Sequence, residues 1–203
     1  MEAALRAGIA IYNHGHYHAA HDAWEDHWLS LESGTENELL LHGLIQFTAT
    51  IYHATNRNWP GTTGLADSAG EYLSPLPDDY REVNLGAVKQ ALKRYEQDPE
   101  QIERAQPIKL THEGHPLTAT DLNFEETAIF ATVIAKEHAY DARQIERAID
   151  YAREAVDADE SNPFVGLLFD FVREPKHRDI IIARLTEHVS RREHQESDVA
   201  GLF

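Results

Sequence analysis

The fold is decided by residues 36–56, ENELLLHGLIQFTATIYHATN, which form the longest apolar stretch of the chain. Apolar and polar residues do not alternate here as they do in a half-buried strand, and the apolar residues cover most of the girth of a helix. We therefore predict a helix over this stretch that is central to the protein and buried on most of its sides.

Two helices are predicted before the central one, and the turns that end them are visible in the sequence. The first covers residues 2–13 and ends at Asn13-His14-Gly15, a typical stop-and-turn signal. The second begins at Tyr17, and its apolar positions continue through Leu31 to the turn at Ser33-Gly34. Because these links are short, neighbouring helices are expected to pack antiparallel.

The remaining helices are predicted from helical spacing and from capping residues. Asn58 is an expected N-cap, and Asn123 with Glu126 and Asp141 with Gln144 are expected capping boxes. Residues 108–120 break the helical pattern and predict a short hairpin or extended arm, whereas residues 193–203 predict a loosely held tail. The predicted helices cover residues 58–73, 85–98, 123–136, 141–156, 162–172 and a last segment that includes 181–189.

These elements predict an all-α fold of antiparallel helical hairpins with tetratricopeptide-like packing. With 203 residues, the chain is long enough for one core and an appended helical part. We expect residues 1–106 to form the core domain and residues 107–203 to form a C-terminal helical extension packed on the same unit.

The chain is strongly acidic, with 35 acidic and 18 basic residues and a formal charge of −17. Dispersed carboxylates with few lysines are typical of proteins that work in molar salt, so we predict a halophilic protein with an acidic surface. An ordinary acidic cytoplasmic protein is the alternative. Both interpretations argue against a nucleic-acid partner, which needs a basic face.

Composition also limits the chemistry and the location of the protein. The chain has no cysteine, which excludes a disulfide framework and thiolate chemistry. No apolar run approaches the roughly 18 residues of a membrane span, and the first residues lack the pattern of a secretory signal. We therefore expect a cytoplasmic protein with no membrane partner, in which histidines are the most interesting reactive groups.

A narrow polar stripe follows the central helix. At about 100° per residue, His42, Gln46 and His53 fall within about 60° of one another. On the preceding helix, His21 and Glu25 are four residues apart and share one face. If the two helices pack antiparallel, His21 and Glu25 face Gln46 and His53 across the interface.

This predicted cluster has three interpretations. His21, Glu25 and His53 are a sufficient ligand set for Zn, Mn or Fe(II), with water or Gln46 completing the shell, and such a metal would activate water. The same residues could form a structural hydrogen-bond network. They could also bind a small ligand or act as acid and base without a metal. Five histidines near turns are expected to bind metal only adventitiously at the surface: His14, His16, His18, His112 and His115.

Two blocks of the sequence resemble a known family. They are Tyr12-Asn13-His14-Gly15-His16-Tyr17 with AHDAWEDHW (residues 20–28), and Gly43-Leu44-Ile45-Gln46 with Tyr52-His53, Asn58 and Gly61. Together they resemble the signature of the bacterial and archaeal domain-of-unknown-function family 309, a small helical domain with no established activity. The resemblance covers about residues 8–75.

The resemblance implies a helical fold and a set of site positions, but no reaction. The implied positions are Gly15, His21, Glu25, Trp28, Gln46, His53, Asn58 and Gly61. The chain departs from the family at Ala19 and Asp22, where the family tends to have Glu, and at His18, where an aromatic residue is typical.

Two classes of function follow from the sequence. The first is a small-ligand or divalent-metal site, with Trp28, His42 and Asn58 as secondary residues around the cluster. The second is a helical-hairpin module that binds a protein partner, in which the cluster only fixes the register of the helices. The sequence does not decide whether the protein is an enzyme, and it names neither a substrate nor an oligomeric state.

Overall fold

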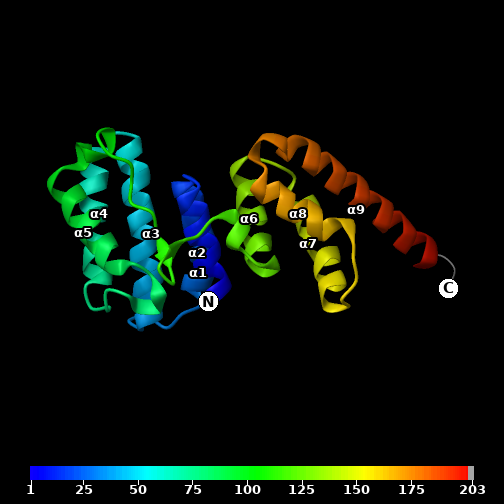
Figure 1. The fold of residues 1–203 in the computed structure, drawn as a ribbon, viewed down its shortest axis with the longest axis horizontal. Coiled ribbons are helices and arrows are strands. Elements are labelled where there is room, and N and C mark those ends of the chain that lie inside the picture. Colours follow the sequence, from blue (N-terminus) through cyan, green and yellow to red (C-terminus); the bar gives the residue numbers. More distant parts are fainter. Residues whose placement is uncertain (201–203) are drawn as a thin grey trace. The chain divides into compact units, whose positions relative to one another are not determined.

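The computed structural model of the protein describes residues 1–200, with side chains through residue 198. It confirms the all-α fold class, because α-helices make up most of the described chain and the sheet consists of two short strands (Figure 1). The α-helices are α1 (Glu2–Asn13), α2 (Tyr17–Leu29), α3 (Glu36–Thr55), α4 (Trp59–Leu73), α5 (Leu85–Gln97), α6 (Phe124–Glu137), α7 (Ala142–Asp157), α8 (Pro163–Arg173) and α9 (Arg178–Ala200). The strands are β1 (Thr111–His112) and β2 (His115–Pro116).

The chain divides into two compact units, Met1–Leu122 (unit 1) and Asn123–Phe203 (unit 2). Residues 107–122 are therefore grouped with the first five helices. The expected organisation into a core domain over residues 1–106 and an extension over residues 107–203 stays a prediction.

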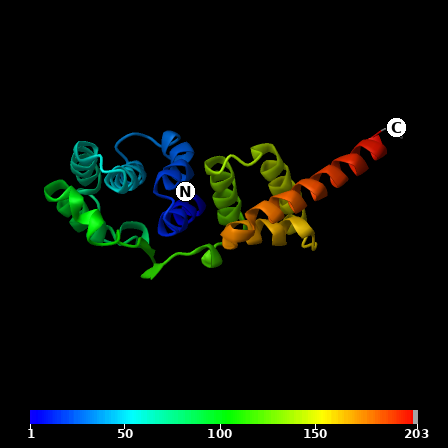
Figure 2. The ribbon, with the colours of Figure 1, turned by 90° about the horizontal axis from the view of Figure 1, so that it is seen from above.

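Helices α1 to α5 pack against one another in chain order to form unit 1 (Figure 2). Helix α3 is central, as predicted, because it packs against both α2 and α4 and buries Leu40, Leu44 and Phe47 completely. His18 at the start of α2 contacts Tyr52 near the end of α3, so these two helices run antiparallel.

The turns on both sides of α2 depend on glycine. Gly15 and Gly34 have φ angles of 89° and 82°, in the left-handed region that residues with a Cβ avoid. The prediction that helix two continues through Leu31 was wrong, since α2 ends at Leu29. It ends there because the Ser30 hydroxyl donates to the His27 carbonyl at 2.6 Å, which satisfies one of the last acceptors of the helix.

The predicted hairpin near residues 108–120 is confirmed, and two asparagine side chains attach it to the helices of unit 1. Asn13 accepts from the Leu110 N–H at 3.0 Å and donates to the Leu110 carbonyl at 2.8 Å and the Leu117 carbonyl at 3.0 Å. Asn84 accepts from the Thr111 N–H at 2.8 Å and donates to the Lys109 carbonyl at 3.1 Å. The segment crosses back from α5 toward the first helix (Figure 2).

His112 was predicted to be a surface residue, and this prediction was wrong. The residue is only 5% exposed and belongs to β1, which packs against α1. Its Nε2 lies 2.9 Å from Glu2 Oε1, and Arg6 donates to its Nδ1 at 3.1 Å. Both ring nitrogens are therefore engaged by residues more than 100 positions away, a contact that local sequence patterns do not report.

Unit 2 is formed by α6 to α9, with α8 packed against α6, α7 and α9. The capping box at Asn123 and Glu126 is confirmed. The one predicted at Asp141 and Gln144 is wrong, because Asp141 accepts from the Arg143 N–H while Gln144 Oε1 is buried without a partner among the described residues.

The predicted loose tail is helical in its described part, since α9 continues through Ala200; residues 201–203 lie outside the described residues. Over residues 1–200, every helix is either too short or too polar to cross a lipid bilayer.

Candidate functional site

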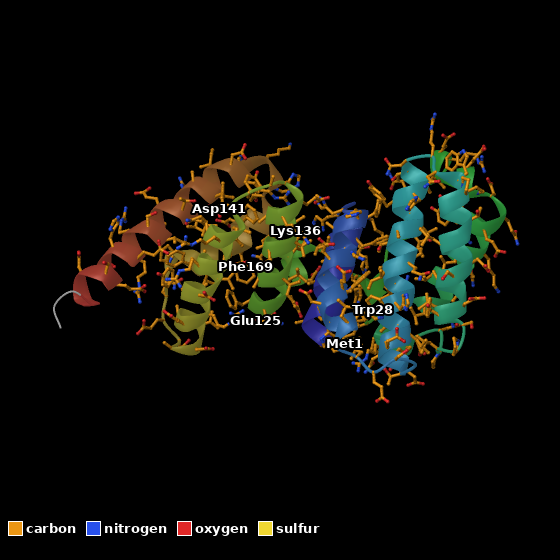
Figure 3. The ribbon with its side chains drawn as sticks, turned by 180° about the vertical axis from the view of Figure 1, so that it is seen from behind. Met1, Trp28, Glu125, Lys136, Asp141 and Phe169 are labelled. Carbon is orange, nitrogen blue, oxygen red and sulfur yellow. The ribbon has the colours of Figure 1, made fainter. Side chains whose placement is uncertain are left out.

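The antiparallel packing of α2 and α3 places the predicted polar residues of both helices at one interface. Figure 3 shows Trp28 in the region between these two helices. Within the interface, the four residues of the predicted cluster do not form one hydrogen-bonded group. They are distributed over three groups, one along α3, one on α2 and one at the turn between α3 and α4.

The first group lies near the start of α3 and contains Gln46. Glu38, His42 and Gln46 follow one another at intervals of four residues, so they stack along one face of the helix. His42 Nδ1 lies 3.2 Å from Glu38 Oε1, and Gln46 Nε2 lies 3.1 Å from His42 Nε2. Because the carboxylate can only accept and the Gln46 amide nitrogen can only donate, neutral His42 carries its proton on Nδ1.

Aromatic side chains from neighbouring helices enclose this group. Trp28 Nε1 donates to Glu38 Oε1 at 2.8 Å, and the Tyr72 ring stacks on the His42 ring with 3.7 Å between centroids. Burial raises the pKa of Glu38, but hydrogen bonds from Trp28, the Gly34 N–H and His42 outweigh it, so the pKa is lowered. Gln46 Oε1 is buried without a hydrogen-bond partner among residues 1–198.

The second group consists of His21, Asp22 and Glu25 on α2, and we call it the His21 group. His21 Nδ1 lies 3.0 Å from Asp22 Oδ1, and His21 Nε2 lies 3.7 Å from Glu25 Oε1. Asp22 thus accepts the Nδ1 proton of a neutral His21, which leaves a lone pair on Nε2. The Nε2 lone pair and the Glu25 carboxylate face each other as two electron donors.

The third group lies where α3 turns into α4. Asn58 Nδ2 is 2.6 Å from His53 Nδ1, and Asn58 Oδ1 accepts from the Gly61 N–H at 3.2 Å as the N-cap of α4. The N-cap role predicted for Asn58 is confirmed. A Cβ at Gly61 would lie 2.6 Å from Asn58 Nδ2 and 2.7 Å from His53 Nδ1, so the group needs glycine at this position.

A pocket of about 220 Å³ between α2 and α3 joins the second and third groups. We call it the α2/α3 pocket, and its lining residues are Tyr17, His18, His21, Ala49, Tyr52 and His53. His21 and His53 therefore share one pocket, whereas Glu25 and Gln46 are not among its lining residues.

The pocket also contains a residue that sequence reasoning dismissed. His18 was expected to be an adventitious surface binder, and it is exposed as expected, but it also lines the pocket. The centroid of its ring lies 5.1 Å from that of Tyr52 and 6.3 Å from that of His21. The sequence spacing already indicated that His18 lies near His21, because the two residues are three positions apart on one helix and therefore share a face.

The comparison with known families covers these residues. The family described as Domain of unknown function (DUF309) matches residues 5–65. The DUF309 match contains all three groups apart from Tyr72, together with every residue that lines the α2/α3 pocket. It ends before α5 and unit 2 begin. No curated protein matches the chain.

Within the DUF309 match, the His21 group has the donor atoms and the spacing that suit a divalent metal. The atoms of His21, Asp22 and Glu25 that could bind a metal lie within 4.8 Å of one another. Because Asp22 Oδ1 is bonded to His21 Nδ1, His21 Nε2 and Glu25 Oε1 are the two that are placed for a cation. Two ligand atoms in a tetrahedral site with bonds of about 2.0 Å are separated by roughly 3.3 Å, so the 3.7 Å between His21 Nε2 and Glu25 Oε1 is close to the needed value. Nitrogen and carboxylate donors in this combination fit Zn, Mn or Fe(II).

Proposed function

We propose that unit 1 is a metal-dependent small-ligand site, in which His21 and Glu25 bind a divalent cation at the edge of the α2/α3 pocket. The observation that carries this proposal is the 3.7 Å separation of His21 Nε2 from Glu25 Oε1, with His21 Nδ1 held by Asp22 Oδ1 at 3.0 Å. Two electron donors at this distance repel each other unless a cation or a proton lies between them. A bound Zn, Mn or Fe(II) would supply Lewis acidity next to the pocket.

Asp22 has a supporting role in this proposal. A histidine that binds a metal usually donates its other ring N–H to a carboxylate, which fixes the tautomer and the ring orientation. Asp22 Oδ1 is placed to do this for His21. An acid at position 22 therefore supports the metal site without contacting the metal.

The test is elemental analysis followed by titration of the full-length, untagged protein, purified in high salt without nickel chromatography. We expect about one metal ion per chain, and Zn²⁺ and Mn²⁺ titrations of chelator-treated protein that saturate at the same ratio. Glu25→Gln should weaken binding by at least roughly tenfold, and Asp22→Asn by roughly tenfold to a hundredfold. Glu32→Gln, a change at an exposed residue beyond α2, is the matched control. Substoichiometric metal in the wild-type protein contradicts the proposal.

A structural role for part of the cluster has its own support. The chain of Trp28, Glu38, His42 and Gln46 connects α2 to α3 and is largely buried, so it can fix the register of the two helices, as a protein-interaction module requires. His21 and Glu25 have side chains that are 31% and 42% exposed. If their role is structural, Glu25→Gln destabilises unit 1; if they bind metal, the metal-free variant should be within about 0.5 kcal/mol of wild type.

The acidic composition supports a proposal about the salt concentration at which the protein works. We infer that the chain is adapted to high salt inside the cell, and that residues 107–203 form a lineage-specific helical extension. The −17 charge supports the first inference, because repulsion among carboxylates is screened by salt. The midpoint of urea unfolding should rise steeply between dilute and molar KCl. A midpoint that does not depend on salt contradicts the inference.

A further inference from the structure

The turn between α3 and α4 fixes the orientation of the His53 ring. The Asn58 N–H donates to the His53 carbonyl at 2.9 Å, so the backbone folds back onto the last turn of α3. The Asn58 side chain then reaches His53 Nδ1 at 2.6 Å from the same direction. His53 is thus held by the backbone and the side chain of one residue.

The orientation of the Asn58 amide follows from its second role as the N-cap of α4. Its Oδ1 accepts from the Gly61 N–H at 3.2 Å, so its Nδ2 must be the atom that faces His53. The reverse orientation would place the amide NH₂ against the Gly61 N–H, where two donors meet and the cap is lost. An amide nitrogen only donates, so His53 Nδ1 accepts and the proton of neutral His53 lies on Nε2.

His53 and His21, which both line the α2/α3 pocket, therefore carry opposite groups at Nε2. His53 offers an Nε2–H donor, while His21, whose Nδ1 proton is taken by Asp22, offers the lone pair of Nε2. A histidine in the Nε2–H tautomer with Nδ1 occupied has no free lone pair for a metal.

We propose that the His53 Nε2–H binds an oxygen of a small carboxylate in the α2/α3 pocket, and that His53 is not a metal ligand. This inference rests on the proposed function and names the ligand class of that site. The volume of about 220 Å³ is enough for a ligand of a few carbon atoms, since a water molecule takes up about 30 Å³. Tyr17, Ala49 and Tyr52 supply apolar surface for its hydrocarbon part.

A cation bound at the His21 group would offset the negative charge of the nearby carboxylates and favour binding of a carboxylate in the pocket. Without it, Asp22 and Glu25 oppose a carboxylate in the pocket, since all three carry the same charge. A competing occupant is an organic ammonium ion, which carboxylates and tyrosine faces also attract. Acetate and methylammonium are small enough to serve as probes for the two alternatives.

The first experiment reads the tautomer directly. Two-bond ¹H–¹⁵N spectra of full-length protein with labelled histidine should show His53 protonated at Nε2, with or without metal. In Asn58→Asp, the carboxylate keeps the cap at Gly61 but can only accept from His53, so the proton should move to Nδ1. Asn56→Asp, at an exposed asparagine of the same turn, is the matched control and should leave the tautomer unchanged. Wild-type His53 protonated at Nδ1 overturns the proposal.

The second experiment separates the carboxylate from the metal. Acetate added to protein with and without Zn²⁺ should shift the His53 Nε2–H signal in at least the metal-loaded form, and Asn58→Asp should bind acetate roughly tenfold more weakly. His53→Gln should keep Zn²⁺ affinity within about twofold of wild type. A tenfold loss of Zn²⁺ affinity in His53→Gln, no acetate response in either form, or a response to methylammonium instead would each overturn the proposal. A wild-type protein that binds no Zn²⁺ refutes the proposed metal site, while the tautomer result still tests His53.

Discussion

Replacing Gly61 by alanine should destabilise unit 1, although the same change elsewhere in α4 should stabilise it. Alanine favours a helix over glycine by up to about 1 kcal/mol. At Gly61, however, the new Cβ would lie 2.6 Å from Asn58 Nδ2 and 2.7 Å from His53 Nδ1, far inside normal contact distance. The Asn58 side chain must then leave its place.

The magnitude follows from the interactions that are lost. Removing the N-cap costs about 1 kcal/mol, and the Asn58–His53 hydrogen bond contributes about 1 kcal/mol more. After the gain in helix propensity of about 1 kcal/mol is subtracted, Gly61→Ala should be less stable than wild type by about 1 kcal/mol. Gly64→Ala is the matched control, because Gly64 is exposed and nothing lies within 4 Å of its added Cβ. That variant should be more stable by about 0.5–1 kcal/mol.

Tryptophan fluorescence during urea unfolding measures this difference in unit 1 alone. All three tryptophans of the chain, Trp24, Trp28 and Trp59, lie within Met1–Leu122. The two variants should therefore differ by about 2 kcal/mol, or roughly thirtyfold in the ratio of folded to unfolded molecules. A Gly61→Ala protein as stable as Gly64→Ala would refute the close approach of Gly61, Asn58 and His53.

Three further predictions concern other contacts of unit 1. Because the pKa of Glu38 is lowered from its ordinary value of 4.5, its hydrogen bonds stabilise the fold above that value and are lost as pH falls through the lowered pKa. Glu38→Gln should cost about 1–2 kcal/mol near pH 7 and progressively less as the pH falls below the ordinary value of 4.5. Urea unfolding at several pH values measures this, and a difference in unfolding free energy that does not change with pH would contradict it. Asn13→Ala leaves three buried backbone groups unpaired, so it should lower the free energy of unfolding by about 2–4 kcal/mol. If urea unfolding shows a loss below about 1 kcal/mol, water has replaced the amide. In Gly43→Ala, the new Cβ overlaps the buried Leu73 side chain, so thermal unfolding should show a loss of about 1–3 kcal/mol, and an unchanged melting temperature would argue against this packing.

Sequence reasoning predicted the elements that local rules determine. The central helix over residues 36–56 differs by one residue from α3, and the N-cap at Asn58 was correct. These two predictions are correct because helix periodicity and capping involve residues within a few positions of one another. The hairpin near residues 108–120 was found by the break in periodicity, but its attachment to Asn13 and Asn84 was not.

The contacts of the candidate site could be predicted from the sequence only in part. Spacing alone identified His21, Gln46 and His53, since each shares a face with other polar residues. Spacing could not reveal that Gln46 bonds to His42 or that His53 bonds to Asn58, because these choices depend on rotamers and on a turn. Glu38 was overlooked although it lies one helical turn before His42. Which nitrogen of each histidine carries the proton is decided by these partners, so it is a property of the folded chain.

The two asparagines that hold the extended segment have a consequence for how this protein avoids aggregation. A side-chain amide presents an N–H donor and a carbonyl acceptor side by side, as a peptide backbone does, so Asn13 and Asn84 each act as a one-residue substitute for a neighbouring strand. Together they bond to the Lys109 carbonyl, the Leu110 N–H and carbonyl and the Thr111 N–H, which could otherwise pair with another chain as a strand edge does. Deamidation of either residue would remove the donor half of this substitute and expose that edge. Slow conversion of asparagine to aspartate would then appear first as self-association, before any loss of helix.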